Sequence, residues 1–333
     1  MRNDALDTAK AGLIFLVVLG HFLERMIGWS QPSSHLLLET IYTMHMPAFI
    51  FISGMLYKDK NWLKNIVFFI ALFIPFQLLY LISDYLMTGQ WRFSLFERPY
   101  WLMWYLMGMM AWTLFMHVFY RSRWVLLLAV LVAFGVGLSP WNNYAYSIGR
   151  IGVFLPFFVM GSRYGYTLLA RLQQQKHVAI FWGLSLVLIM LILYSTQLSQ
   201  FWWYGSLSYA QLKEDVWQGS LTRLACLLLS GWGVLTLLAL FQGLGSRFTL
   251  LGQNTLPVYL LHGFVVIWLA HWIPLDVSAG IKIAVCILLS IITCWVLRQS
   301  LFDRILRQLS LWLVKPTSKL WKNNKIKMLK RDD

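Results

Sequence analysis

The sequence contains little charge, little cysteine and no long hydrophilic stretch. Only 12% of its 333 residues are Asp, Glu, Lys or Arg, whereas an ordinary soluble domain carries about 25%. No hydrophilic segment is long enough to form a separate soluble domain. The three cysteines, Cys226, Cys286 and Cys294, lie in apolar runs without CxxC spacing, which weighs against a disulfide framework or a metal site. We therefore expect a single membrane domain.

What the chain has in abundance is apolar and aromatic residues. Hydrophobic residues make up 59% of it, with 18 Trp and 15 Tyr, and the mean hydropathy is +0.62. Such a composition is typical of a polytopic membrane protein with aromatic belts at both interfaces. The net charge of +15 is explained by topology signals and a basic tail beside an anionic leaflet, so no nucleic-acid partner is expected. We also expect no cleavable signal peptide.

Hydropathy predicts ten spans of about 20 residues each. An even number of spans places both termini on one side. If that side is the cytoplasm, the inner segments hold 21 of the 28 Lys and Arg residues and the outer segments hold seven, as the positive-inside rule requires. The sequence thus predicts an all-α integral membrane protein with both termini cytoplasmic, a membrane domain at 1–314 and a basic cytoplasmic tail at 315–333. The predicted spans are 8–27, 41–57, 65–87, 100–120, 124–140, 147–166, 177–195, 218–242, 250–273 and 280–300.

Three polar residues of the first span share one helical face. At 100° per residue, Lys10 and His21 differ by about 20° in azimuth, and Asp7 lies about 40° from His21. The rise from Lys10 to His21 is about 16 Å, so Lys10 lies near the cytoplasmic surface and His21 in the outer half. Ionisable groups inside membrane helices mark candidate functional sites; the structural alternatives are a snorkelling lysine and an interhelical histidine hydrogen bond. Glu24 and Arg25 are expected to mark the outer end of this helix.

The second span adds a second histidine. His45 and Pro47 are expected close to the outer surface, and Ser53 and Gly54 deeper. Small residues such as Ser and Gly also permit close helix packing, which is the structural alternative for that pair. Since His45 enters the membrane from the same side as His21, the two histidines are expected to converge in the outer half.

Two further spans carry polar or aromatic side chains in patterns. In the ninth, Thr255, Tyr259 and His262 are spaced i, i+4, i+7 and share one face, which indicates the wall of a polar cavity. The fourth begins with aromatic residues that suit an interfacial belt or stacking on a sugar. The loop at 196–217 is also aromatic, and either lies along the interface or covers a cavity mouth. The candidates at the start of the fourth span are Arg98, Trp101, Trp104 and Tyr105.

The chain resembles the membrane acyltransferase-3 family, and within it the fucose 4-O-acetylase-like acetyltransferases. The resemblance is carried, in the family's order, by five segments. They are "LDTAKAGLIFLVVLGH" at 6–21, "HMPAFIFISGML" at 45–56, "WLMWYLMGM" at 101–109, "LPFFVMGSRYG" at 155–165 and "LGQNTLPVYLLHGF" at 251–264.

The resemblance implies a ten-helix enzyme of the cell inner (plasma) membrane. It would transfer an acyl group, usually acetyl, from cytoplasmic acyl-CoA (acetyl-CoA) to a hydroxyl of a cell-surface glycan or lipid-linked sugar. The histidine that ends the first segment, His21, corresponds to the family's proposed catalytic residue. Lys10 stands where many members have arginine, and the resemblance implies that it contacts CoA.

The residues agree with this chemistry. A hydroxyl needs a base to remove its proton, and imidazole has a suitable intrinsic pKa. The sequence has no GxSxG motif and no cysteine among the polar stripes, which favours direct attack on the thioester, with Tyr259 or His262 donating to its oxygen.

The competing hypotheses are a proton-coupled transporter and a non-catalytic scaffold. The predicted site has His21, His45 and Asp7 as catalytic residues, Lys10, Ser53, Thr255, Tyr259 and His262 for acyl-CoA, Arg98, Trp104 and Tyr105 for the acceptor, and no metal.

Overall fold

The computed structural model describes residues 3–91, 97–174, 178–196, 198–242, 244, 248–273 and 277–309. Every regular element within these ranges is helical, which confirms the predicted all-α membrane class. The predicted tail at 315–333 lies outside the described residues, and the side on which the termini lie stays a prediction.

Most of the helices are long and apolar, whereas α8 and α10 have five residues each. The α-helices are α1 (Asp4–Met26), α2 (Pro32–Met55), α3 (Trp62–Thr88), α4 (Trp104–Phe119), α5 (Val125–Gly135), α6 (Ile148–Gln174), α7 (Ala179–Thr196), α8 (Gln200–Tyr204), α9 (Val216–Phe241), α10 (Thr249–Gln253), α11 (Thr255–Trp272) and α12 (Ala279–Leu297). The 3-10 turns are η1 (Asp59–Asn61), η2 (Trp101–Met103), η3 (Val136–Leu138) and η4 (Ala145–Ser147).

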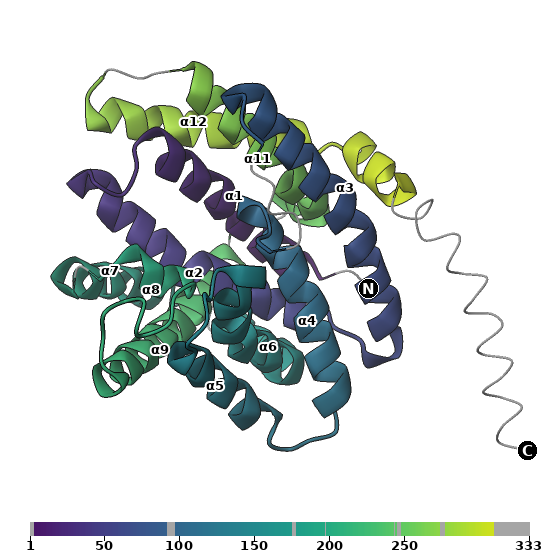
Figure 1. Ribbon diagram of the computed structural model, residues 1–333, viewed down its shortest axis with the longest axis vertical. Helices are drawn as coiled ribbons and strands as arrows, with labels where there is room; N and C mark the ends of the chain where they lie inside the picture. Colours follow the sequence, from purple (N-terminus) through teal and green to yellow (C-terminus); the bar gives the residue numbers. More distant parts are fainter. Residues whose placement is uncertain are drawn as a thin grey trace, which may run out of the picture.

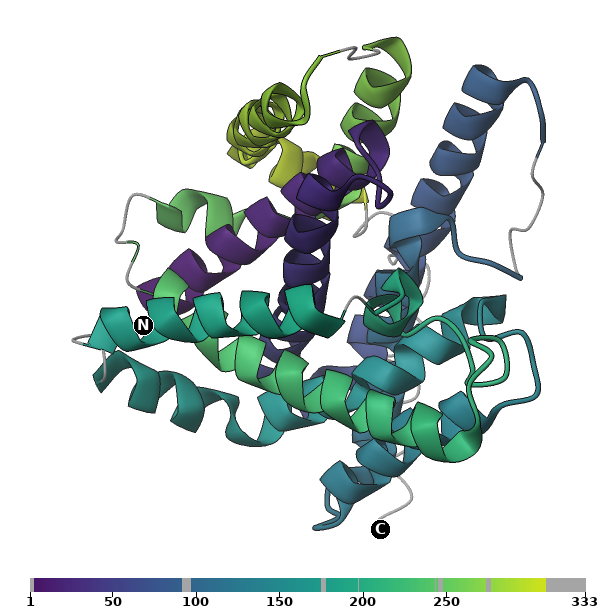
Figure 2. The same cartoon turned by 90° about the vertical axis from the view of Figure 1, so that its left-hand side faces the viewer.

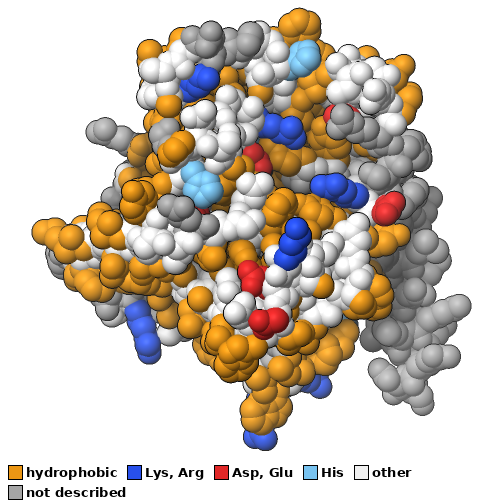
Figure 3. Space-filling model, turned by 60° about the vertical axis from the view of Figure 1, so that its left-hand side comes forward, with side chains coloured by type: hydrophobic (Ala, Val, Ile, Leu, Met, Phe, Trp, Pro, Cys, Tyr) orange, Lys and Arg blue, Asp and Glu red, His pale blue; other side chains and the backbone are white. Residues whose placement is uncertain are grey.

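Nine helices in the described ranges are long and apolar enough to cross a membrane. The fifth predicted span, 124–140, is a shorter apolar helix, Val125–Leu138. Large aliphatic side chains remain exposed on the outer helices, among them Ile74, Leu184 and Leu288, as expected of surfaces that face lipid. Figure 3 shows hydrophobic side chains covering broad areas of one face, with charged side chains scattered between them.

Helix α1 is the central element of the bundle. It packs against α2, α9, α10, α11 and α12, and Figure 1 shows it between α11 and α12 on one side and α2 on the other. Figure 2 gives the same arrangement from a perpendicular direction. The Asn3 side chain caps the helix by accepting a hydrogen bond from the Leu6 amide. Because α1 is buried on most sides, the polar residues along it face protein rather than lipid.

Helix α2 begins at Pro32, nine residues before the predicted start of the second span. His45 therefore lies well inside the helix and is 1% exposed, so the predicted start of the second span was wrong, while the depth of His45 in the membrane stays a prediction. Hydropathy missed the first turns because they are polar. Their hydroxyl groups are satisfied within the chain: Ser34 donates to the Gly28 carbonyl and Thr40 to the Leu36 carbonyl, which lowers the cost of burying them.

Helices α2 and α6 approach each other closely through glycines. A Cβ atom at Gly54 would lie 2.0 Å from the Phe158 carbonyl oxygen, and one at Gly161 would lie 1.9 Å from that of Phe51. Only glycine permits this backbone contact. The two residues of the predicted Ser53–Gly54 pair therefore have different roles. Gly54 packs α2 against α6, while Ser53 faces a cavity.

Candidate active site

A small cavity of about 50 Å³ lies at the end of α1 that carries His21. Helices α1 and α2, the η2–α4 segment, α6 and the short α8 all contribute to its wall. His21 and His45 both line it, so the structure brings together the two histidines that were expected to converge. Its other polar and aromatic lining residues include Glu24, Tyr42, Trp101, Trp104, Arg150 and Tyr204.

The Glu24 carboxylate is the hydrogen-bonding centre of this cavity. The Tyr42 hydroxyl donates to Oε2 at 2.7 Å, and the Tyr204 hydroxyl donates to Oε1. His21 Nδ1 lies 3.4 Å from Oε2. Burial raises the pKa of Tyr204, and the Glu24 carboxylate raises it further, which keeps this phenol protonated as a donor. Glu24 lies in the last turn of α1, as predicted, but its two phenolic partners come from α2 and α8, a role that the sequence did not indicate.

The same contacts orient the His21 ring. Its Nδ1 atom faces the Glu24 carboxylate and the Tyr42 hydroxyl, the latter at 3.3 Å. The ring meets Trp101 edge to face at a centroid distance of 4.4 Å and stacks on His262 at 5.4 Å. A proton on Nδ1 is favoured by the carboxylate, so Nε2 is left unprotonated in the neutral ring. An imidazole held in this tautomer can act as a base through Nε2.

His45 and His262 are oriented by their own helices. His45 Nδ1 lies 2.6 Å from the Ile41 carbonyl oxygen and His262 Nδ1 lies 2.8 Å from that of Val258. A carbonyl oxygen only accepts, so Nδ1 carries the proton in both rings. His262, which was predicted to contact acyl-CoA, stacks on His21, and its contact with acyl-CoA stays a prediction.

Asp7 lies far from His21 along α1. Fourteen residues separate them, a rise of about 21 Å. The Asp7 carboxylate pairs with Lys10, with Oδ1 2.7 Å from Nζ. The predicted stripe is therefore divided, with an ion pair at one end of the helix and the histidine at the other.

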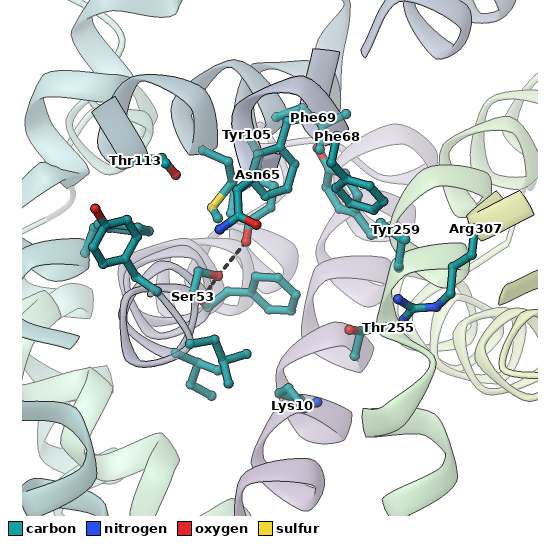
Figure 4. A pocket seen from close by; sticks show the side chains of 18 of the residues that line it. Lys10, Ser53, Asn65, Phe68, Phe69, Tyr105, Thr113, Thr255, Tyr259 and Arg307 are labelled. Carbon is teal, nitrogen blue, oxygen red and sulfur yellow. Dashed lines mark hydrogen bonds between the residues drawn. The ribbon is translucent and has the colours of Figure 1, made fainter. Parts of the chain in front are cut away.

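A larger cavity of about 340 Å³ opens at the Lys10 end of α1. It is lined by four of the five residues predicted to bind acyl-CoA, namely Lys10, Ser53, Thr255 and Tyr259. Figure 4 shows Lys10, Thr255 and Arg307 on one side of the opening and the hydrogen-bonded Ser53 and Tyr105 on the other. The Ser53 and Tyr105 hydroxyls are 2.6 Å apart, and Arg307 belongs to the helical segment 300–309.

A series of ring contacts joins the two cavities. Tyr105 meets Tyr259 at a centroid distance of 5.2 Å, and Tyr259 meets His262 at 6.4 Å. His262 then stacks on His21. The Tyr259 hydroxyl donates to the Leu102 carbonyl oxygen. Since the donors of Tyr259 and His262 are both engaged by backbone carbonyls, neither is free to donate to a thioester oxygen in this arrangement.

The three residues predicted to bind the acceptor line three different cavities. Trp104 lines the His21 cavity and Tyr105 the Lys10 cavity. Arg98 lines a third cavity of about 550 Å³, together with Arg25 and Trp101. Trp104 and Tyr105 are separated because successive residues of one helix point in different directions, and Arg98 lies in the segment before η2.

Several polar residues of these cavities were missed as site residues, among them Glu24, Tyr42, Arg150, Tyr204 and Arg307. Glu24 had a local signal, because a residue three positions after His21 lies on a neighbouring face of the helix. Tyr204 lies in the aromatic loop at 196–217, which was predicted either to lie along the interface or to cover a cavity mouth. Its hydrogen bond to Glu24 favours the second alternative. Tyr42, Arg150 and Arg307 had no comparable signal.

Within the described ranges, no group of three or more His, Cys, Asp or Glu side chains is arranged to hold a metal ion. The three cysteines are free and buried. None of them lines the His21 or Lys10 cavity, so the chemistry of both cavities depends on oxygen and nitrogen groups.

The fold and the cavities define a class of protein: a helical membrane protein with a buried candidate active site. A family model described as "Acyltransferase domain" (acyltransferase 3) matches residues 3–299. The chain therefore belongs to the acyltransferase-3 family, and it is a membrane acyltransferase. The match covers the family as a whole, so the fucose 4-O-acetylase-like resemblance stays a prediction. No curated protein and no solved structure shows a significant match.

Proposed function

We propose that this protein is an O-acyltransferase that moves an acetyl or other short acyl group from cytoplasmic acyl-CoA to a hydroxyl of a cell-surface glycan or lipid-linked sugar. The observation that carries the proposal is the division of α1 between two cavities. Lys10 lines one of them and His21 the other. Such an arrangement suits a reaction whose two substrates enter from opposite sides of the membrane.

The Lys10 cavity is the proposed donor site. The CoA phosphates carry negative charge, and Lys10 and Arg307 supply cationic groups in its wall. The inner wall holds Phe69, Tyr105 and Tyr259, whose apolar surfaces suit a short acyl chain. The ring contacts from Tyr105 to His262 place this wall next to His21.

His21 is the proposed general base. Its Nε2 atom accepts the proton of the acceptor hydroxyl as the oxygen attacks the thioester carbonyl carbon. A new C–O bond forms, the C–S bond breaks, and the thiolate of CoA leaves. The proton on His21 then passes to that thiolate, so the products are the O-acyl ester and CoA thiol.

Glu24 is the proposed positioning residue for His21. Its carboxylate lies 3.4 Å from Nδ1, where it holds the ring orientation and stabilises the imidazolium that forms during transfer. The Tyr42 and Tyr204 hydroxyls hold the carboxylate in turn. Supporting groups of this kind fix the geometry of a reactive side chain.

The test is mass spectrometry of cell-surface glycans from cells that lack the gene and are complemented with wild type, His21→Ala or His117→Ala. His117 contacts Asp59 and Trp62 and lines neither the His21 nor the Lys10 cavity, so it is the matched histidine control. We expect the mass increment of one acyl group with wild type and with His117→Ala, and its loss with His21→Ala at equal membrane levels of protein. A fully active and well-folded His21→Ala protein would overturn the assignment.

A further inference from the structure

The third cavity, of about 550 Å³, lies at the His21 end of α1. The ends of α1, α3 and α11 and the segment before η2 form its wall. It is the largest of the three cavities that contact α1, yet the reaction described above does not use it. Its polar and aromatic lining residues are Arg25, Asp84, Arg98, Tyr100, Trp101 and His271.

The cavity is biased toward positive charge. Arg25 and Arg98 are both exposed, and neither forms an ion pair with a carboxylate in the described part of the chain. Instead, the Arg25 guanidinium lies 4.6 Å from the centre of the Trp101 ring, and that of Arg98 lies 4.3 Å from the centre of the Tyr144 ring. An arginine stacked on an aromatic ring keeps its N–H donors available at its edge.

Among the described residues that line the cavity, the single carboxylate is withdrawn from it. Asp84 is 8% exposed, and the Tyr100 hydroxyl donates to its Oδ1 at 3.0 Å. The accessible charges that the described lining residues contribute are therefore the two guanidinium groups, with the His271 imidazole beside them. This arrangement attracts an anion, since no exposed carboxylate lies among these lining residues.

Trp101 separates this cavity from His21. Its ring lines both the small cavity and the large one, and its centroid lies 4.4 Å from that of His21. Its backbone has a φ of 32°, a value that costs a bulky residue free energy. Strained residues of this kind concentrate at ligand sites. A molecule in the large cavity is thus one aromatic ring away from the proposed base.

We infer that the large cavity binds the acceptor, and that the acceptor is an anionic sugar, one that carries a carboxylate or a phosphate. The anionic group pairs with Arg25 and Arg98, since guanidinium groups bind both oxyanions in bidentate geometry. Tyr100 and Trp101 supply aromatic surface for the apolar parts of the sugar. The reacting hydroxyl then reaches His21 past the edge of Trp101. The inference rests on the proposed function for its reaction, but the binding itself is tested separately.

Binding is measured by saturation-transfer NMR on the full-length protein in lipid nanodiscs. Three probes are compared: methyl glucuronide, which carries a carboxylate, glucose 1-phosphate, which carries a phosphate, and neutral methyl glucoside. We expect a saturable signal from at least one anionic probe and a much weaker signal from methyl glucoside. The carboxylate and phosphate probes together show which anion the cavity takes. Equal binding of the neutral probe, or no anionic binding, would overturn the inference.

The arginines are tested by Arg25→Gln and Arg98→Gln, with Arg25→Lys as a variant that keeps the charge. Loss of one charge-assisted contact should weaken anionic binding about tenfold. Arg123→Gln is the matched control, because the Arg123 guanidinium also stacks on a tryptophan, 4.9 Å from the centre of the Trp124 ring, but does not line this cavity. Unchanged anionic binding in folded Arg25→Gln and Arg98→Gln proteins would contradict the inference.

The two proposals fail in different ways. If anionic sugars bind through Arg25 and Arg98 but the cells show no acylated glycan, the proposed function fails and the binding site stands. If glycans are acylated in a His21-dependent manner but anionic sugars show no arginine-dependent binding, the function stands and the assignment of the acceptor fails.

Discussion

At one end of α1 Lys10 pairs with Asp7, three residues earlier in the same helix. At the other end His21 faces Glu24. The Glu24 carboxylate accepts hydrogen bonds from the hydroxyls of Tyr42 and Tyr204, which lie 18 and 180 positions away in the sequence. The first arrangement is local and leaves a cation at the edge of a wide cavity. The second is assembled from three helices and holds a base in a narrow one. Under the proposed function, we expect the Lys10 end to contribute to substrate binding and the His21 end to the chemical step.

The largest effect should come from removing the charge of Glu24. Glu24→Gln keeps the size of the side chain and one acceptor oxygen, so it can accept from one of the two tyrosines, but it no longer stabilises an imidazolium at His21. We expect kcat to fall by about 100-fold or more, by analogy with carboxylates that orient a catalytic histidine, while the KM for acyl-CoA stays within a few-fold. Steady-state kinetics of purified protein in nanodiscs measure both constants.

A rise in the KM for acyl-CoA with unchanged kcat in Glu24→Gln would contradict the division between the two ends. Glu24→Asp serves as the conservative variant, because it keeps the charge and should recover part of the lost kcat.

A smaller effect, on KM and not on kcat, is expected at the Lys10 end. Lys10→Gln removes a cation from the cavity wall, so the KM for acyl-CoA should rise about tenfold, as expected for one charge-assisted contact. The kcat should stay close to that of wild type, because the base is about 16 Å away along the helix. Lys10→Arg should keep a low KM.

Lys60→Gln is the control for Lys10, since Lys60 does not line the donor cavity. A fall in kcat with unchanged KM in Lys10→Gln would show that both ends of α1 serve the chemical step.

The smallest effect should come from Tyr204→Phe. This change removes one of the two hydroxyls that hold the Glu24 carboxylate, while Tyr42 still donates to it. We expect kcat to fall by only several-fold, because one hydrogen bond contributes about 1 kcal/mol. Tyr194→Phe is the control, as Tyr194 is 65% exposed. If Tyr204→Phe lowers kcat as much as Glu24→Gln does, the position of the Glu24 carboxylate depends mainly on Tyr204, and the hydrogen bond from Tyr42 does not hold it.

Local periodicity explains how much of the site was predictable. The azimuths of Lys10 and His21 follow from the geometry of one helix, and both residues line cavities as residues on a protein-facing stripe should. The same reasoning grouped His262 with Thr255 and Tyr259. The three residues do share a face of α11. His262 lies seven residues after Thr255, however, so it lies beyond the Lys10 cavity and stacks on His21.

The sequence by itself determined the membrane class, the all-helical fold and the polar face of α1, because hydropathy and helical geometry depend only on neighbouring residues. The tertiary structure decided that Glu24 is the centre of the His21 cavity and that Asp7 and Lys10 form a separate pair. It also decided that Arg98, Trp104 and Tyr105 line three different cavities. These outcomes depend on which helices pack against α1, and packing joins residues such as Glu24 and Tyr204 that no local pattern connects.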